Sequence, residues 1–239
     1  MYKQIPLAIS PDTALTFDNF YQTPLVKPII SELKKFISTK EVCSSDQVLY
    51  LWGAHDSGIT HLLNASQNEN ASLAMQYLPL KELVHYSPQD ILEGLELLDL
   101  VCIDDIDCLE TSPEWEQGLF HLYNRLRDAG KRILIGGHKP PAQLSLSLPD
   151  LQSRLQWGVT LHLNELSDDD KPSAIQFCAD KLGMQLSDEV AHFLLQRMER
   201  SPQTLFDFIK QLDHHSLAEQ RKLTIPFVKI VLKESLSKS

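Results

Sequence analysis

The sequence predicts an α/β fold in which a doubly wound parallel sheet is followed by a small all-helical domain. Three observations support this fold class. Short apolar runs that favour strands alternate with helical stretches through residue 164. One of these runs, residues 97–106, is apolar almost throughout, as expected for a strand that is covered on both faces. From residue 165 onward only helical patterns occur, which predicts a domain boundary between 164 and 165.

The predicted first domain extends over residues 12–164 and follows an extended tail, residues 1–11, in which Pro6 and Pro11 oppose a helix. Apolar residues three or four positions apart indicate its helices, and short continuous apolar runs indicate its strands. In chain order we expect a helix over 24–38, a strand over 48–52, a helix beginning near 60, a strand over 75–80, a helical stretch around 88–95, a strand over 97–106, a helix over 113–129 and a strand over 131–137.

The predicted second domain, residues 165–239, is a helical lid. Ser167 is followed by three aspartates, and this order is typical of a residue that caps a helix whose first turn is acidic. Gly183 ends that helix, and serine or threonine close to a proline marks two later helix starts. We expect helices over 168–182, 187–199, 202–217 and 225–236.

Composition narrows the class of protein. The chain has 239 residues, and 32 acidic against 22 basic residues give a formal net charge of −10. That charge disfavours DNA as a direct partner, because it repels the phosphate backbone. No apolar run approaches the roughly 18 residues of a membrane span, and no secretory leader is recognisable, so we expect a cytoplasmic protein without membrane contact. The cysteines are scattered without a paired motif and fit reduced structural thiols: Cys43, Cys102, Cys108 and Cys178.

A glycine-rich loop between the strand 48–52 and the next helix nearly matches the phosphate-loop pattern G-x-x-x-x-G-K-[ST]. In that pattern the glycines let backbone amides surround phosphates at a helix N-terminus. Ile59 occupies the lysine position, whereas Thr60 retains the hydroxyl that contacts Mg²⁺. A simple glycine-rich turn is the alternative. The loop consists of Gly53, Ala54, His55, Asp56, Ser57, Gly58, Ile59 and Thr60.

Two aspartates at the end of the strand 97–106 strengthen the phosphate-loop interpretation. Asp104 and Asp105 follow the apolar run in the arrangement of a Walker B motif. There the first carboxylate holds Mg²⁺ together with Thr60, and the second orients an attacking water. Aspartates at a strand end also serve as turn residues, but a phosphate loop upstream makes the functional interpretation the better one.

Several segments together resemble the AAA+ family of the bacterial initiator DnaA, from about residue 12 to the end of the lid. The chain stops without the DNA-binding domain with which DnaA continues, so it is most similar to the Hda-type members, the regulatory inactivators of DnaA. The segments that carry the resemblance are TFDNF at 16–20, GITHLL at 58–63, VCIDDID at 101–107, PDLQSRLQWG at 149–158 and LSDDDK at 166–171.

The resemblance implies roles for further residues. Arg154 stands where the family has an arginine finger, which acts in trans on the nucleotide of a neighbouring subunit. A structural ion pair with Asp150 is the alternative. The resemblance also extends the nucleotide site beyond the loop, although an aromatic plug in the core is an equal alternative for the N-terminal residues. These added positions are Phe17, Asn19, Phe20, His61 and Gln203.

Three departures from the family remove groups that handle the γ-phosphate. Ile59 replaces the loop lysine, His138 replaces the usual sensor 1 aspartate, and Gln203 replaces the sensor 2 arginine, for which the nearby Arg200 is a partial substitute. We therefore expect a nucleoside diphosphate, most simply ADP with or without Mg²⁺, held mainly by backbone amides. Intrinsic hydrolysis should be feeble.

The N-terminal tail is similar to the peptide with which Hda and other proteins bind the β sliding clamp. An edge strand or frayed tail is the alternative. The resemblance implies association with DNA only through the clamp and allows a homo-oligomer. The matching residues are Gln4, Ile5, Leu7 and Ile9.

These features favour a negative regulator of chromosomal replication initiation that docks on the DNA-loaded clamp and stimulates ATP hydrolysis on DnaA. One alternative is a self-contained AAA+ ATPase similar to a helicase loader, and another is a nucleotide-sensing scaffold that stimulates nothing. The remaining histidines, including the pair His214 and His215, show no ligand spacing, and we expect no structural metal.

Overall fold

The computed structural model describes residues 12–38, 47–70, 72–198, 201–219 and 223–236. These residues form two compact units, Met1–Asn164 and Glu165–Ser239, each described here by itself. Arg200 and the expected clamp-binding residues of the tail lie outside the described residues. Those tail residues are Gln4, Ile5, Leu7 and Ile9.

A five-stranded parallel sheet in the order β2-β3-β4-β1-β5 forms the centre of the first unit. The α/β fold class with a parallel sheet is thereby confirmed. Because β4 lies between β1 and β3, the segments that follow these three strands meet at one edge of the sheet. The strands are β1 (Val48–Trp52), β2 (Met75–Pro79), β3 (Leu100–Asp104), β4 (Arg132–Gly137) and β5 (Val159–His162).

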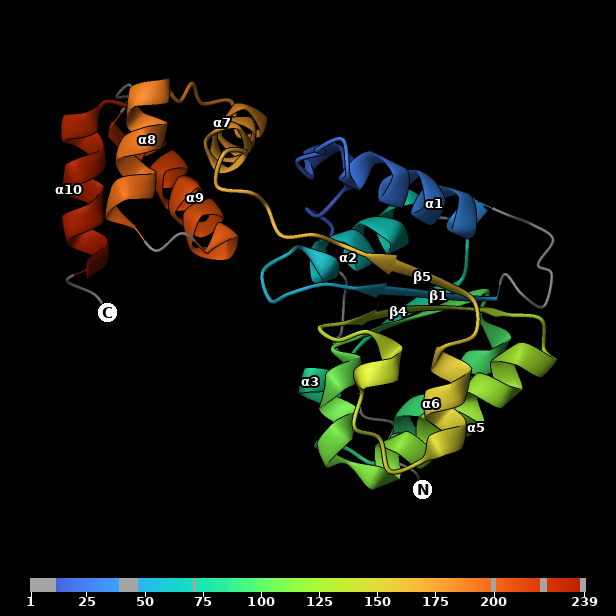
Figure 1. Ribbon diagram of the computed structural model, residues 1–239. Coiled ribbons are helices and arrows are strands. Elements are labelled where there is room, and N and C mark those ends of the chain that lie inside the picture. Colours follow the sequence, from blue (N-terminus) through green and yellow to red (C-terminus); the bar gives the residue numbers. More distant parts are fainter. Residues whose placement is uncertain (1–11, 39–46, 71, 199–200, 220–222, 237–239) are drawn as a thin grey trace. The chain divides into compact units, whose positions relative to one another are not determined.

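Helices cover both faces of this sheet (Figure 1). α1 (Val26–Ser38) and α2 (Ile59–Glu69) lie on one face, where Leu33, Leu49 and Leu62 belong to one apolar cluster. The opposite face packs against a second cluster that contains Trp115, Leu122 and Ile135. The helices on that face are α3 (Leu80–Leu83), α4 (Pro88–Leu92), α5 (Pro113–Asp128) and α6 (Pro149–Leu155).

The segment between β2 and β3 differs from the sequence prediction. The helical stretch expected to reach residue 95 ends at Leu92, because Gly94 has a φ of 77°, and a short 3-10 turn, Leu95–Leu97, follows. β3 is shorter than predicted and begins at Leu100, the first residue with strand partners on both sides. Leu97 is 80% exposed and lies outside the strand. The apolar run therefore predicted too long a strand, because hydrophobicity does not show which residues have neighbouring strands to pair with.

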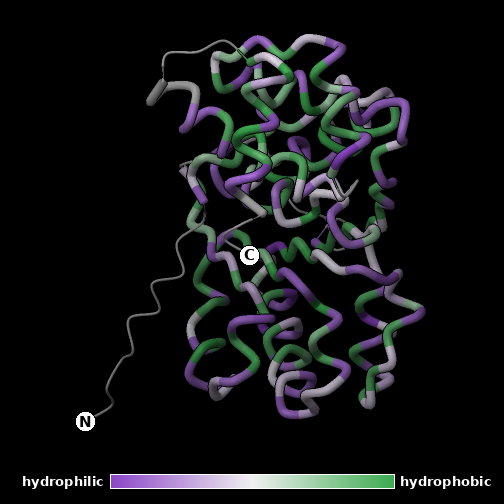
Figure 2. Tube along the Cα trace, turned by 90° about the vertical axis from the view of Figure 1, so that its left-hand side faces the viewer, coloured by the Kyte–Doolittle hydropathy of each residue, from purple (hydrophilic) through white to green (hydrophobic). Residues whose placement is uncertain are grey.

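The second unit is all-helical and contains its own apolar core, which includes Leu194, Ile209 and Val228. Hydrophobic and hydrophilic residues are interspersed along the chain (Figure 2). The Ser167 hydroxyl accepts from the Asp170 amide at 3.1 Å, as expected of a capping residue, in the turn that leads into the first helix, which begins at Lys171. No helix within the described ranges is long and apolar enough to span a membrane. The helices are α7 (Lys171–Lys181), α8 (Asp188–Arg197), α9 (Pro202–Glu219) and α10 (Ile225–Leu236).

Candidate functional site

The phosphate loop, residues 53–60, connects β1 to α2 and is shaped by its glycines. A Cβ atom on Gly53 would lie 2.3 Å from the carbonyl oxygen of Leu163, so no side chain fits there. Gly58 has a φ of 98°, which favours glycine, and α2 begins at the next residue. The Ser57 hydroxyl oxygen is buried without a hydrogen-bond partner. An anionic phosphate group fits this loop, because the loop offers a helix N-terminus, a backbone without bulky side chains at the glycines and a hydroxyl that lacks a hydrogen-bond partner.

Ile59 does not present its side chain to this cradle. It is only 3% exposed and belongs to the apolar cluster between α2 and the sheet. A Cβ on Gly136 of β4 would lie 2.7 Å from the Ile59 Cγ2 atom, so the two residues are in close contact. Ile59 was expected among the nucleotide-binding residues, but its side chain is a core residue. Only its position at the first turn of α2 remains relevant to phosphate binding.

Asp104 ends β3 in a buried position, with 2% of its surface exposed. Its carboxylate accepts hydrogen bonds from the Tyr77 hydroxyl at 2.7 Å and from the Asp105 amide at 3.0 Å. Burial raises the pKa of Asp104, and hydrogen bonds from Tyr77 and Thr60 partly oppose this shift. Thr60 and Asp104 are therefore brought together as the sequence predicted, and both offer the oxygen ligands that Mg²⁺ prefers.

The side chain of Asp105 is already engaged. Its Oδ1 atom lies 3.2 Å from the Nε2 atom of His138, and the residue itself has a φ of 56°. The His138 amide also donates to Asp107 at 2.6 Å. The hydrogen bond to Asp105 and the charge of Asp107 raise the pKa of His138, whereas burial opposes the shift. The expected role of Asp105 in orienting a water thus conflicts with its contact to His138.

His55 covers this group from the loop side. Its ring stacks on the His138 ring with a centroid separation of 3.8 Å and an interplanar angle of 35°. The sequence pattern places His55 only within the loop and gives no sign of this pair. The contact arises because β4 lies beside β1, so the residue after one strand meets the loop after the other.

The N-terminal residues expected to line the base have different roles. Phe17 is 1% exposed and packs in the core, which agrees with the aromatic-plug alternative. Asn19 forms a capping box with Thr16, so its side chain is used locally. Phe20 is the residue that borders the loop: its ring would be 2.6 Å from a Cβ on Gly58.

His61 was also expected at the nucleotide. Its Nε2 atom lies 2.9 Å from the carbonyl oxygen of Thr16, and its ring contacts Phe20 edge-on with centroids 5.0 Å apart. These contacts join α2 to the segment before α1. His61 therefore acts as a structural link rather than as a group directed at the phosphate loop.

Arg154 lies in the last turn of α6 and rests on α5. Its guanidinium donates a hydrogen bond to Asn124, and its Cζ atom is 4.6 Å from the ring centroid of Phe120 and 5.6 Å from that of Tyr123. Among the described residues it forms no ion pair with Asp150. Arg154 therefore has a structural role that the sequence did not reveal. In the sequence, this role is indicated only by the spacing of Phe120 and Asn124, which places them on the same face of a helix.

Gln203 belongs to the second unit, where its Nε2 atom donates to Asp207 at 2.9 Å. Its contribution to the nucleotide site therefore stays a prediction. No group of three or more histidine, cysteine or acidic side chains suited to a metal ion occurs within the described part of the chain.

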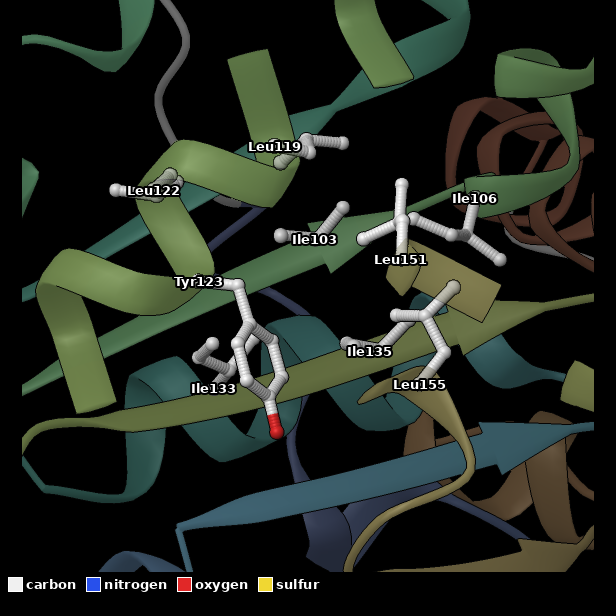
Figure 3. A pocket seen from close by; sticks show the side chains of 9 residues that line it. All are labelled: Ile103, Ile106, Leu119, Leu122, Tyr123, Ile133, Ile135, Leu151 and Leu155. Carbon is white, nitrogen blue, oxygen red and sulfur yellow. The ribbon is translucent and has the colours of Figure 1, made fainter. Parts of the chain in front are cut away.

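A narrow apolar pocket lies apart from the phosphate loop, between the sheet and the helices α5 and α6 (Figure 3). Tyr123 extends along it, and Leu151 and Leu155 of α6 close one side. The pocket has no charged lining residue. We interpret it as a packing gap beneath α6 and not as the nucleotide site.

Family comparisons agree with the geometry of the site. Residues 12–162 match the model of the bacterial DnaA ATPase domain, which covers more than half of the chain. This chain belongs to the bacterial DnaA ATPase-domain family. Residues 168–232 match a second model, the lid domain of Hda, so the DnaA-like domain and an Hda-type lid occur together in one chain.

Solved structures of low sequence identity share the fold of this chain. Domain III of the DnaA protein from Thermotoga maritima aligns with a TM-score of 0.75 and 24% identity, covering 94% of this chain and 97% of that chain. AMPPCP-bound DnaA from Aquifex aeolicus gives 0.71 and 20%, with 84% and 66% covered. The RuvB Holliday junction branch migration motor from Thermotoga maritima gives 0.67 and 19%, with 92% and 71% covered.

Proposed function

We propose that this protein is a nucleotide-bound negative regulator of replication initiation that stimulates ATP hydrolysis on the initiator DnaA. The observation that most supports this proposal is the phosphate loop. Its backbone has the shape of a phosphate-binding loop, while the side chain at the lysine position, Ile59, is buried in the core. The combination of a DnaA-type domain and an Hda-type lid supports DnaA as the partner.

The site is suited to hold a nucleotide rather than to hydrolyse it. The loop amides and the N-terminus of α2 would bind the α- and β-phosphates of ADP, and Thr60 with Asp104 would hold Mg²⁺. The side chain at the lysine position does not reach the terminal phosphate, because Ile59 points into the core. Asp105 is paired with His138. A bound diphosphate in this site serves as a structural element, and this protein's own turnover is expected to be very low.

Arg154 would supply the catalytic group for the partner. A guanidinium stabilises the charge that develops on a transferred phosphoryl group, an effect of about 10³–10⁵ in rate for arginine fingers. In this chain Asn124 and Phe120 hold the guanidinium at the surface of α5, where its side chain is half-buried. These contacts restrict the orientations of the guanidinium before the partner binds, so less conformational freedom is lost on binding.

The tail would bring the regulator to DNA. Gln4, Ile5, Leu7 and Ile9 would bind the β sliding clamp as an extended peptide, which links the protein to DNA despite its net charge of −10. Replacing Gln4 and Leu7 with alanine should weaken binding to purified clamp while ADP binding stays unchanged. Unaltered clamp affinity would contradict this part of the proposal.

The decisive experiment compares Arg154→Ala and Arg154→Lys with wild type. Hydrolysis of DnaA-bound ATP is measured in the presence of DNA-loaded clamp, and ADP binding is measured separately. We expect Arg154→Ala to lower the maximal stimulation by about 10³-fold or more. Lysine should rescue little, because it lacks the planar fork. Full stimulation by Arg154→Ala would refute the mechanism, and rapid ATP turnover by the wild type alone would favour a self-contained ATPase.

A further inference from the structure

The segment that connects α6 to β5 exposes a large aromatic side chain. Trp157 is 55% exposed, whereas Trp115 is 1% exposed in the core. Trp52 is partly buried and stacks on His162 with ring centroids 3.9 Å apart. The Trp157 side chain makes no hydrogen bond or ring contact with another described residue. An indole in this state leaves much of its apolar surface in water.

The backbone holds Trp157 in this exposed place. Its amide donates to the carbonyl oxygen of Arg154 at 3.0 Å, which closes a turn at the end of α6. The following residue, Gly158, has a φ of 99°, and a Cβ there would lie 2.3 Å from the carbonyl oxygen of Val48. The turn is therefore fixed at one end by a hydrogen bond and at the other by a glycine that admits no side chain.

The same turn carries Arg154, three residues before Trp157. The hydrogen bond from the Trp157 amide to the Arg154 carbonyl oxygen closes a turn, in which the first and fourth Cα atoms lie less than about 7 Å apart. Arg154 is only half-buried, and its guanidinium rests against α5. A partner that brings the anionic phosphates of its nucleotide to this guanidinium would come close to the turn that carries the indole. The charge of Arg154 and the apolar surface of Trp157 thus form one small contact surface.

We propose that Trp157 is an anchor for the nucleotide-carrying AAA+ partner on which Arg154 acts. This inference rests on the proposed function and adds the surface that binds the partner. Tryptophan and arginine are the residue types most enriched among contacts that dominate binding free energy. The two residues have separate roles: Trp157 increases the affinity for the partner, and Arg154 increases the rate at which the partner's ATP is hydrolysed.

The test measures two quantities separately: the concentration of this protein that gives half-maximal stimulation, and the maximal rate of ATP hydrolysis. Hydrolysis of DnaA-bound ATP is followed while the concentration of Trp157→Ala, Arg154→Ala or wild type is raised on DNA-loaded clamp. Trp157→Ala should raise the half-saturating concentration about tenfold or more, with the maximal rate retained within about twofold. The matched control is Tyr86→Ala, which removes an aromatic side chain of similar exposure, 48%, from another surface. This control should behave as wild type.

A second measurement uses quenching of tryptophan fluorescence by acrylamide. Because Trp52 and Trp115 also fluoresce, the contribution of Trp157 is the difference between the full chain and Trp157→Ala. This contribution should become less accessible to acrylamide when ATP-loaded DnaA is added. An unchanged half-saturating concentration for Trp157→Ala, together with the loss of rate in Arg154→Ala, would overturn the anchor but leave the proposed function intact. Normal stimulation by Arg154→Ala would instead overturn the proposed function and the anchor with it.

Discussion

The phosphate loop and the α5–α6 junction are assembled in different ways. The loop is built from eight consecutive residues, so its shape is encoded in a short pattern between β1 and α2. At the junction, contacts connect residues about 30 positions apart: Arg154 binds Asn124, and Glu116 of α5 binds Ser147 and Leu148. The sequence pattern of the loop is therefore local, whereas the position of Arg154 depends on a separate helix.

This difference bears on the proposed function. In the loop a core isoleucine stands at the lysine position, and the glycines set the backbone shape. At the junction the guanidinium of Arg154 contacts side chains of α5. A protein that holds a nucleotide passively and acts on another protein's nucleotide would show this pattern.

The largest expected effect comes from breaking the junction at Glu116, which is 2% exposed. Its carboxylate accepts from the amides of Ser147 and Leu148 and from the Ser147 hydroxyl, just before α6 begins. Glu116→Ala would remove the buried acceptor of these three part-buried hydrogen bonds and lower the free energy of unfolding by about 3 kcal/mol. Denaturant titration of the purified protein measures this loss.

The matched control for that prediction is Glu114→Ala, because Glu114 lies in the same first turn of α5 but is exposed. Its cost should stay below about 0.5 kcal/mol. Equal stabilities of the two variants would show that the contacts of Glu116 do not support α6.

A smaller effect is expected when the loop is broken at Gly53. In Gly53→Ala the new Cβ would meet the Leu163 carbonyl oxygen at 2.3 Å, and relieving that clash requires a backbone shift. Overpacking of this kind costs about 2 kcal/mol, and the displaced loop should also bind ADP more weakly. Thermal unfolding and ADP titration measure the two effects. Gly130→Ala is the control for the second effect, since open space surrounds Gly130 and its cost should come from φ alone, with ADP binding retained.

The smallest expected effect is at Asp104, where the substitution should increase the stability of the protein. Burial raises the pKa of this carboxyl, which means that folding disfavours its charged form relative to its protonated form. Asp104→Asn removes the charge. Its amide oxygen can still accept from the Asp105 amide and its NH₂ group can donate to the Tyr77 hydroxyl oxygen, so the melting temperature in Mg²⁺-free buffer should rise by roughly 2 °C. The benefit should shrink below the raised pKa, where the native carboxyl is protonated. A lower melting temperature would show that the carboxylate is stabilising.

Much of the fold was predictable from sequence, because its signals are local. The strands around Leu49, Cys102 and Leu134 are buried on both faces and read as continuous apolar runs. The α/β class and the membership of the DnaA-like family are confirmed. α6 and β5 received no specific prediction: α6 is only 7 residues long, and β5 is an edge strand with mostly exposed side chains.

The candidate site was predictable only in part, for the same physical reason. The loop and Asp104 follow from local patterns, but the direction of the Ile59 side chain depends on Gly136 in β4. The pairing of His138 with Asp105 and its stacking on His55 likewise depend on the order of strands in the sheet. The pattern of one segment does not specify which other segment lies beside it.

Gly136 has a consequence for how this loop can mutate. A Cβ at this position would lie within 3.0 Å of Ile59 Cγ2, Asp104 Oδ1 and Leu63 Cδ2. The residues at 59 and 136 therefore form an epistatic pair in which the order of substitution matters. Enlarging position 136 is damaging while isoleucine occupies 59, and removing the side chain at 59 relieves the shortest of the three contacts but leaves those with Asp104 and Leu63. Attempts to restore a lysine by directed evolution should begin at position 59.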